Sequence, residues 1–119
     1  MELRLLTLGA GQEVGKSCVV LNAHGVNVMF DCGLHLGRKG AERLPDFSVL
    51  GSPASLNKAI QVVVITHFHI DHIGALPHLT EVLGYRGTVV MTRATQALAQ
   101  LMLEDFVGLS RDGCAYAPP

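Results

Sequence analysis

The feature that most constrains the fold is a nearly unbroken run of β-branched residues at positions 60–66 (Ile-Gln-Val-Val-Val-Ile-Thr). Such a run is typical of a strand covered on both faces, which requires helices on at least one side of the sheet. Residues 73–83 then carry apolar side chains at helical spacing and end at Gly84, a common residue after a helix. The sequence therefore predicts a strand followed by a helix, as in an α/β fold.

Three shorter β-rich runs precede this unit, at residues 3–8, 18–23 and 26–31. His24 and Gly25 separate the last two runs and predict a hairpin turn. Glycines and prolines interrupt residues 32–55, which we expect to form a long and functional loop. Another strand is expected at 87–92 and an amphipathic helix at 94–107. This order predicts an α/β sandwich in which a layer of helices packs on a sheet.

Composition limits the kind of protein. The 119 residues fit one domain, and a formal charge of −1 gives no general basic surface for nucleic acid. Any RNA would then be held by metals, by a local patch or by sequence elsewhere.

The three cysteines are widely spaced, which predicts no disulfide framework and a reducing compartment. Without a signal-like start or an apolar run near the roughly 18 residues of a membrane span, we expect a soluble intracellular protein.

A dense cluster of metal-ligand side chains, His67-Phe68-His69-Ile70-Asp71-His72, directly follows the apolar run. Residues two apart on an extended segment point the same way, so His67 and His69 can converge on one ion. Asp71 and His72 lie where the chain turns into the helix and can serve a second ion. Metals about 3.5–4 Å apart are typical of phosphodiester cleavage. Imidazole and carboxylate without thiolate suit zinc, and also permit iron or manganese.

The alternative without a metal is a set of loop histidines, with Asp71 capping the helix. It gives no packing reason for four polar groups to gather after a buried strand, so we favour the metal interpretation.

The pattern His-x-His-x-Asp-His at a strand end resembles the signature of the metallo-β-lactamase fold, an αββα sandwich. The resemblance implies that His67 and His69 hold one Zn²⁺, and that Asp71 and His72 hold a second and act in catalysis. The family also has an earlier aspartate in a hydrophobic-Asp-Cys-Gly setting, which here is Phe30-Asp31-Cys32-Gly33. Asp31 is thereby implied to orient a metal ligand from behind.

Longer stretches resemble the β-CASP group of RNA endonucleases within this fold, and the resemblance covers residues 1 to about 108. The closest similarity is to the two eukaryotic RNA-cleaving subunits, that of Integrator and that of pre-mRNA 3′-end cleavage; Pro45-Asp-Phe-Ser48 is closer to Integrator. The resemblance implies cleavage of RNA in 3′-end processing. It also implies partner subunits that include a non-catalytic paralogue, no membrane, and a nuclear location with the cytoplasm left open. The stretches that carry the resemblance to the β-CASP group are residues 8–18, 30–37, 45–48, 66–77, 84–85 and 95–106.

The pattern is incomplete, because the family also has later histidine and aspartate ligands and a β-CASP segment. No histidine follows His78. We therefore expect residues 1–108 to be a partial domain, residues 109–119 to be a tail, and the chain to be an N-terminal fragment that is inactive alone. Two other classes stay open: a small-molecule metallo-hydrolase of the same fold, such as a thioesterase, and a non-catalytic fragment that binds partners.

Residues 10–17 (Ala-Gly-Gln-Glu-Val-Gly-Lys-Ser) also fit a relaxed phosphate-loop pattern. A phosphate loop must open a helix whose amides hold the phosphates. Here a β run comes after Lys16 and leads into a hairpin, so nucleotide binding is disfavoured.

The remaining candidates have structural interpretations that we favour. Cys32 is expected to pack as a small hydrophobe, and a solvated loop is favoured over a phosphate contact for the one basic patch, formed by Arg38, Lys39 and Arg43. The other histidines are expected to be a loop contact (His35), a turn residue (His24) and a helix-surface residue (His78).

Overall fold

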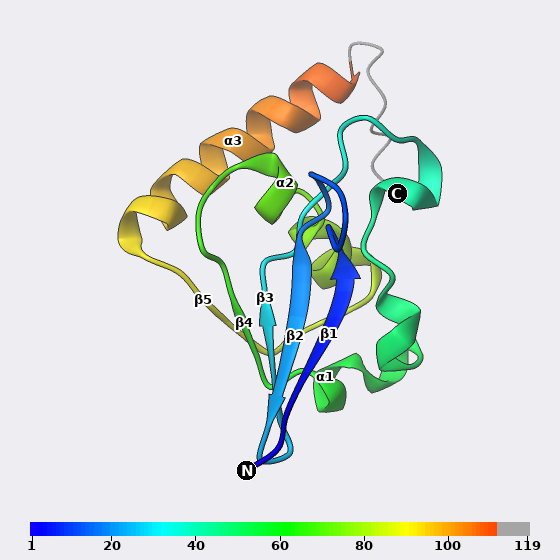
Figure 1. Ribbon diagram of the computed structural model, residues 1–119. Helices are drawn as coiled ribbons and strands as arrows, with labels where there is room; N and C mark the ends of the chain where they lie inside the picture. Colours follow the sequence, from blue (N-terminus) through cyan, green and yellow to red (C-terminus); the bar gives the residue numbers. More distant parts are fainter. Residues whose placement is uncertain (112–119) are drawn as a thin grey trace.

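The computed structural model describes the backbone of residues 1–111 and the side chains of residues 1–108. Its centre is a five-stranded sheet with the strands in sequence order (Figure 1). The first three strands are antiparallel, and the last two run parallel to the third. This mixed sheet with helices confirms the predicted α/β class. The strands are β1 (Leu3–Gly9), β2 (Cys18–Ala23), β3 (Val26–Phe30), β4 (Val62–Val64) and β5 (Thr88–Val90).

The predicted hairpin is present between β2 and β3. Ala23 pairs with Val26, and the two intervening residues, His24 and Gly25, both have positive φ, at 52° and 77°. That combination is what a two-residue turn of the right twist requires.

The predicted loop at 32–55 is only partly correct, because it contains three short 3₁₀-helices. They are η1 (Gly40–Arg43), η2 (Phe47–Leu50) and η3 (Pro53–Ser55), and the helix α1 (Leu56–Ala59) comes directly after them. A local side-chain hydrogen bond stabilises one of these short helices, because Asp46 Oδ1 accepts from the Ser48 amide at 3.2 Å and caps η2.

The strand predicted at 60–66 is regular only over β4. Ile60 donates its amide to the Leu56 carbonyl at 2.9 Å and ends α1. Ile65 still bonds to the Val90 carbonyl at 2.9 Å before the chain leaves the sheet. The first residue of the apolar run therefore ends helix α1, and its last residues lead out of the sheet toward α2.

The helix predicted at 73–83 is wrong as a single regular helix. It begins earlier, with α2 (Ile70–Ile73), and continues as a π-helix, η4 (His78–Val82). The break has a physical cause, because Ala75 donates its amide to the Cys32 carbonyl at 3.0 Å in a neighbouring loop. Pro77 has no amide hydrogen to continue the helical pattern.

The last helix, α3 (Arg93–Arg111), is longer than predicted. It extends through residues 109–111 and so crosses the boundary that we expect between domain and tail, while the rest of that tail lies outside the described residues. No helix in the described part of the chain is long and apolar enough to cross a membrane.

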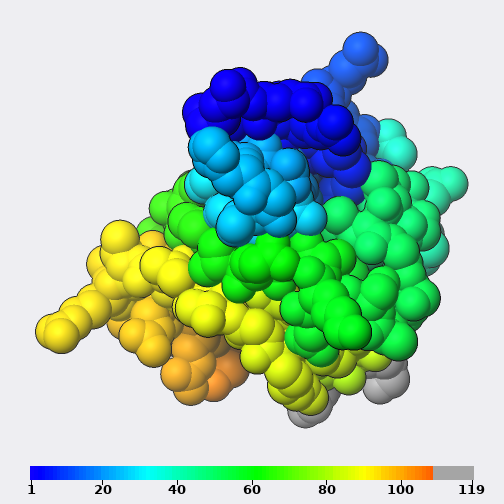
Figure 2. All heavy atoms as spheres, turned by 90° about the horizontal axis from the view of Figure 1, so that it is seen from below, coloured from blue at the N-terminus to red at the C-terminus, as the bar shows by residue number. Residues whose placement is uncertain are grey.

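The hydrophobic core lies on one face of the sheet. The side chains of Val20, Met29 and Val63 are aligned across three neighbouring strands and almost fully buried, and along each strand they alternate with half-buried side chains on the other face. Helical residues cover them, including Leu56 of α1 and Ile73 of α2. In the view along the strands, the segment around residues 40–60 packs against one side of the sheet (Figure 2).

The opposite face of the sheet is also apolar, yet none of its side chains is buried. Leu5 on β1 is 70% exposed and Leu3 is 55% exposed. The strand register places Leu5 beside Leu21, then Val28 and Val62 on the following strands. One helix layer and one sheet with an apolar outer face are consistent with the N-terminal part of an αββα sandwich.

Candidate metal centre

The histidine motif lies at the carboxyl end of β4, beside the end of β3. Because these two strands are parallel neighbours, residues that follow them meet at the same edge of the sheet. Asp31 follows β3, and Thr66 and His67 follow β4. His69 is still extended (φ −67°, ψ 148°) and is the N-cap of α2, so Asp71 and His72 lie in its first turn.

The three imidazole rings of the motif lie close together. The ring centroids of His67 and His72 are 3.9 Å apart, and those of His67 and His69 are 4.8 Å apart. Asp71 joins them, with its Oδ2 3.4 Å from His72 Nε2. The structure thus brings all four predicted metal-ligand side chains to one place.

Asp31 binds this cluster from behind. Its side chain is 7% exposed, Oδ1 accepts a hydrogen bond from the Thr66 amide at 2.7 Å, and Oδ2 lies 2.8 Å from His72 Nδ1. With Nδ1 directed to the carboxylate, Nε2 of His72 is left for the side of the cluster where Asp71 lies. A carboxylate behind a metal-binding imidazole is the usual arrangement in metalloproteins.

The backbone of Asp31 is in the left-handed region, with φ at +65°. Aspartate tolerates this conformation better than most residues, and such departures are concentrated at functional sites.

Two loops hold the backbone of the motif in place. The Ser17 amide donates to the Asp71 carbonyl at 2.9 Å, and the Cys32 amide donates to the His72 carbonyl at 2.9 Å. Gly33 lies between them, and a Cβ there would be only 1.7 Å from the Asp71 oxygen. Glycine is required at position 33 because the backbones approach too closely for any side chain.

The donor set is chemically suited to zinc, but it is not a closed site. No group of three or more histidine, cysteine, aspartate or glutamate side chains within the described residues is arranged to hold one ion. Zinc normally takes three or four protein ligands.

The family assignment follows from sequence comparison. The model of the metallo-beta-lactamase superfamily matches residues 11–108. The chain belongs to this superfamily.

Several curated proteins are similar to the chain. The cleavage and polyadenylation specificity factor subunit 3-II of Arabidopsis thaliana is 51% identical over 106 residues, which are 89% of this chain and 17% of that protein. An Integrator complex subunit 11 homolog of Dictyostelium discoideum is 48% identical over 106 residues, 89% of this chain and 14% of its own length. Integrator complex subunit 11 of Danio rerio is 42% identical over 111 residues, which are 93% of this chain and 19% of that protein.

These comparisons confirm the resemblance predicted from the motifs, both to the metallo-beta-lactamase superfamily and to the two kinds of RNA-processing subunit. The chain spans less than a fifth of the length of these three relatives.

The two cysteines of the described residues, Cys18 and Cys32, lie in the hydrophobic core. Burial, together with the charge of Asp31, raises the pKa of the Cys18 thiol to about 12, and burial raises the pKa of Cys32 as well. In the absence of a metal both thiols are therefore protonated near neutral pH. Cys32 is fully buried in the core, as predicted for a small hydrophobe.

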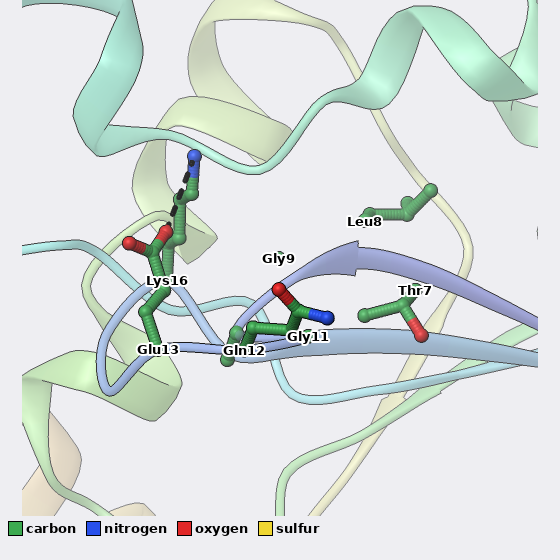
Figure 3. Close-up of a pocket in the computed structure, with 8 residues that line it drawn as sticks. Thr7, Leu8, Gly9, Gly11, Gln12, Glu13 and Lys16 are labelled. Atoms are coloured by element: carbon green, nitrogen blue, oxygen red, sulfur yellow. Dashed lines mark ion pairs between the residues drawn. The ribbon is translucent and has the colours of Figure 1, made fainter.

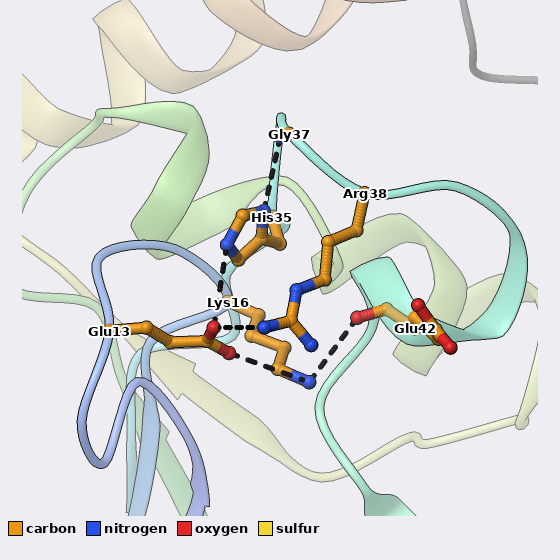
Figure 4. A network of polar contacts seen from close by, with 6 residues as sticks. All are labelled: Glu13, Lys16, His35, Gly37, Arg38 and Glu42. Atoms are coloured by element: carbon orange, nitrogen blue, oxygen red, sulfur yellow. Dashed lines mark hydrogen bonds and ion pairs between the residues drawn. The ribbon is translucent and has the colours of Figure 1, made fainter.

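A second polar cluster, centred on Glu13, lies on the same two loops (Figure 4). Glu13 pairs with Arg38, and its carboxylate is 3.8 Å from Lys16 Nζ and 3.7 Å from His35 Nε2. Lys16 Nζ also donates to the Glu42 carbonyl at 3.2 Å. His35 is thus a loop contact, as predicted, and Arg38 is ion-paired rather than only solvated.

Sequence reasoning missed the role of Glu13. Its partner Arg38 is 25 positions away, and a lone glutamate in a glycine-rich stretch gives no periodic signal.

The helix-surface role predicted for His78 is incomplete. Its ring stacks on Phe47 with centroids 6.3 Å apart, and burial lowers the pKa of His78.

The phosphate-loop pattern forms an open hollow of about 550 Å³, lined by residues from Thr7 to Glu13 and by Lys16 (Figure 3). β2 begins at Cys18, so no helix follows Lys16 and no row of helical amides faces the hollow. The structure confirms the prediction that the helix needed for a phosphate loop is missing here.

Proposed function

We propose that this chain supplies part of the dinuclear metal centre of an RNA endonuclease that acts in RNA 3′-end processing. The observation that carries the proposal is the convergence of three imidazoles and Asp71 in front of the Asp31–His72 contact. Its RNA-processing context is supported by 42–51% identity to subunits whose names refer to cleavage and polyadenylation or to Integrator.

In this proposal His67 and His69 hold one metal ion, and Asp71 and His72 hold the other. Zinc suits the donors, and iron or manganese would fit the same set. When bound, a metal pair supplies an activated water and neutralises charge on the phosphate. The chain's own contribution is to hold the ligands: Asp31 keeps His72 in place, and the loops around Ser17 and Gly33 fix the backbone that carries Asp71.

Two ligands for each ion are too few for a working centre. We therefore propose that residues 1–108 form the N-terminal part of the domain and that the missing ligands come from outside these 119 residues. The proposed partners are an RNA substrate and the other subunits of a nuclear RNA-processing complex, including a non-catalytic paralogue.

The test is a chimera in which this chain replaces the aligned 106 residues of the Arabidopsis relative. We expect the purified chimera to cleave single-stranded RNA in the presence of zinc. His69→Ala should abolish cleavage, while His24→Ala, in the exposed hairpin turn, should leave it unchanged. The unaltered relative serves as the positive control.

A folded, metal-loaded chimera that leaves RNA intact while the unaltered relative cleaves it would contradict the proposal. Hydrolysis of a thioester in place of RNA would instead favour a small-molecule hydrolase. The chain by itself should bind zinc weakly and cleave nothing; two tightly held ions and cleavage lost in His69→Ala would show that it suffices alone.

A further inference from the structure

Thr66 is the residue that joins Asp31 to the first histidine of the motif. Its amide donates to Asp31 Oδ1 and its hydroxyl donates to Asp31 Oδ2, both at 2.7 Å. The same hydroxyl oxygen lies 3.1 Å from His67 Nδ1. Asp31 Oδ2 also contacts His72 Nδ1 at 2.8 Å, so one carboxylate is linked to two imidazoles.

The number of available protons decides the direction of each bond. An ionised carboxylate only accepts, so the single hydroxyl proton of Thr66 is used on Asp31. The Thr66 oxygen then has only lone pairs to offer His67. Nδ1 of His67 must therefore carry a proton, and the neutral ring has its lone pair on Nε2.

We infer that Thr66 is a positioning residue that transmits the effect of Asp31 to His67 and fixes the Nδ1–H tautomer of that ring. Asp31 fixes the same tautomer of His72 directly. One buried carboxylate thus leaves Nε2 of both imidazoles deprotonated. This deepens the proposed function and takes its purpose from it, because a neutral imidazole binds a metal only through the nitrogen without a proton.

A purely structural role for Thr66 would have a different signature. In that case its hydroxyl would only tie the end of β4 to the end of β3, and its loss would lower stability without changing the His67 ring. The tautomer of His67 separates the two roles, and it can be measured without any metal.

The experiment uses the full chain labelled with ¹⁵N at histidine, without metal, at about pH 8, above the reference pKa of about 6.5 for a histidine in a model peptide. Long-range ¹H–¹⁵N spectra distinguish the two tautomers of each ring. Thr66→Val removes the hydroxyl but keeps the amide bond to Asp31 and the branched shape, and Thr66→Ser restores the hydroxyl. His24, exposed in the hairpin turn, is an internal reference.

We expect the Nδ1–H form of His67 to predominate in the wild type and in Thr66→Ser. In Thr66→Val the His67 signals should move toward the tautomer mixture of His24, while those of His72 stay unchanged. Either a wild-type His67 protonated at Nε2, or the same His67 tautomer in Thr66→Val as in the wild type, would overturn the inference.

Zinc titration of the same three proteins separates this inference from the proposed function. We expect Thr66→Val to bind zinc about 10-fold more weakly than Thr66→Ser, at the low end for a residue that supports a metal ligand. If the tautomer changes as expected but none of the proteins binds zinc, the relay stands, the expected weak zinc binding of the chain alone is wrong, and the chimera decides the proposed function. Equal zinc affinities despite a changed tautomer would remove the purpose that we assign to the relay.

Discussion

Asp31 Oδ2 and His72 Nδ1 lie 2.8 Å apart, although the two residues are separated by 41 positions in the sequence. The contact joins the end of β3 to the first turn of α2, and Asp31 is 5% exposed where it forms. The carboxylate also accepts two hydrogen bonds from Thr66. Both of its oxygens are therefore engaged by Thr66 or His72, so the loss of the carboxylate should affect the proposed metal ligands first.

Asp31→Asn should lower zinc affinity by about 10–100-fold, the usual effect of removing the carboxylate behind a metal-binding imidazole. The amide has the same shape, but its NH₂ replaces one acceptor oxygen, so either the Thr66 or the His72 donor loses its partner. An unsatisfied buried donor also costs about 1–3 kcal/mol of stability. Calorimetric zinc titration and thermal unfolding measure the two effects.

The matched control is Asp105→Asn, which makes the same chemical change at an exposed position on α3. It should change neither zinc affinity nor stability. Equal zinc affinity for Asp31→Asn and the wild type would show that Asp31 has no influence on the ligands.

A charged residue should lower stability strongly on one face of β1 and hardly at all on the other. Leu8 is 4% exposed and belongs to the core, whereas Leu5 is 70% exposed on the uncovered face of the sheet. Leu8→Glu should remove most of a total stability of about 5–15 kcal/mol, because it buries an unpaired charge. Leu5→Glu should change stability by no more than about 0.5 kcal/mol and should reduce self-association, since it interrupts an exposed apolar patch.

Urea unfolding and sedimentation velocity of the two variants test this contrast. If Leu5→Glu unfolds the chain as completely as Leu8→Glu, the outer face is covered in solution and our assignment of the two faces is wrong.

The strand predictions that agree with the structure, and the convergence of the histidine motif, rest on short-range physics. Two β-rich runs around His24-Gly25 can form a hairpin by local twist alone, and this hairpin is present. The motif from His67 to His72 contains four proposed ligand side chains within six residues, so a turn between strand and helix can bring them together.

The predictions that failed depend on contacts distant in sequence. The helix predicted at 73–83 is broken where the Ala75 amide bonds to the Cys32 carbonyl, and no helical periodicity reports such a partner. The ion pairs of Glu13 likewise arise only when residues 11–17 and 35–43 come together in the fold.

Magnesium ATP should not raise the melting temperature of the chain. Lys16 Nζ is held by the Glu42 carbonyl and lies near Glu13, and the strand β2 begins where a nucleotide site needs a helix. A ligand at 100 times its dissociation constant would stabilise the native state by about 2.7 kcal/mol, which thermal unfolding detects easily. A clear shift with Mg-ATP that disappears in Lys16→Ala would restore the phosphate-loop interpretation.

Glu13→Gln should loosen the two loops that hold the histidine motif. The carboxylate faces Arg38, Lys16 and His35, and the glutamine side chain keeps the size but loses the charge that attracts them. The same loops donate the Ser17 and Leu34 amides to carbonyls of the motif. For a partly exposed cluster we expect a loss of about 1 kcal/mol, or roughly fivefold in the opening equilibrium.

Hydrogen exchange followed residue by residue measures this effect, with faster exchange expected at Ser17 and Leu34 and unchanged exchange at Met29 in the core. Glu2→Gln is the control, because Glu2 pairs with Arg4 at the surface, where the two side chains are 71% and 68% exposed. Unchanged exchange at Ser17 and Leu34 in Glu13→Gln would mean that the backbone bonds to Asp71 and Ile70 hold the loops without help from the charges. Faster exchange there, together with weaker zinc binding, would show that Glu13 as well as Asp31 supports the proposed metal ligands.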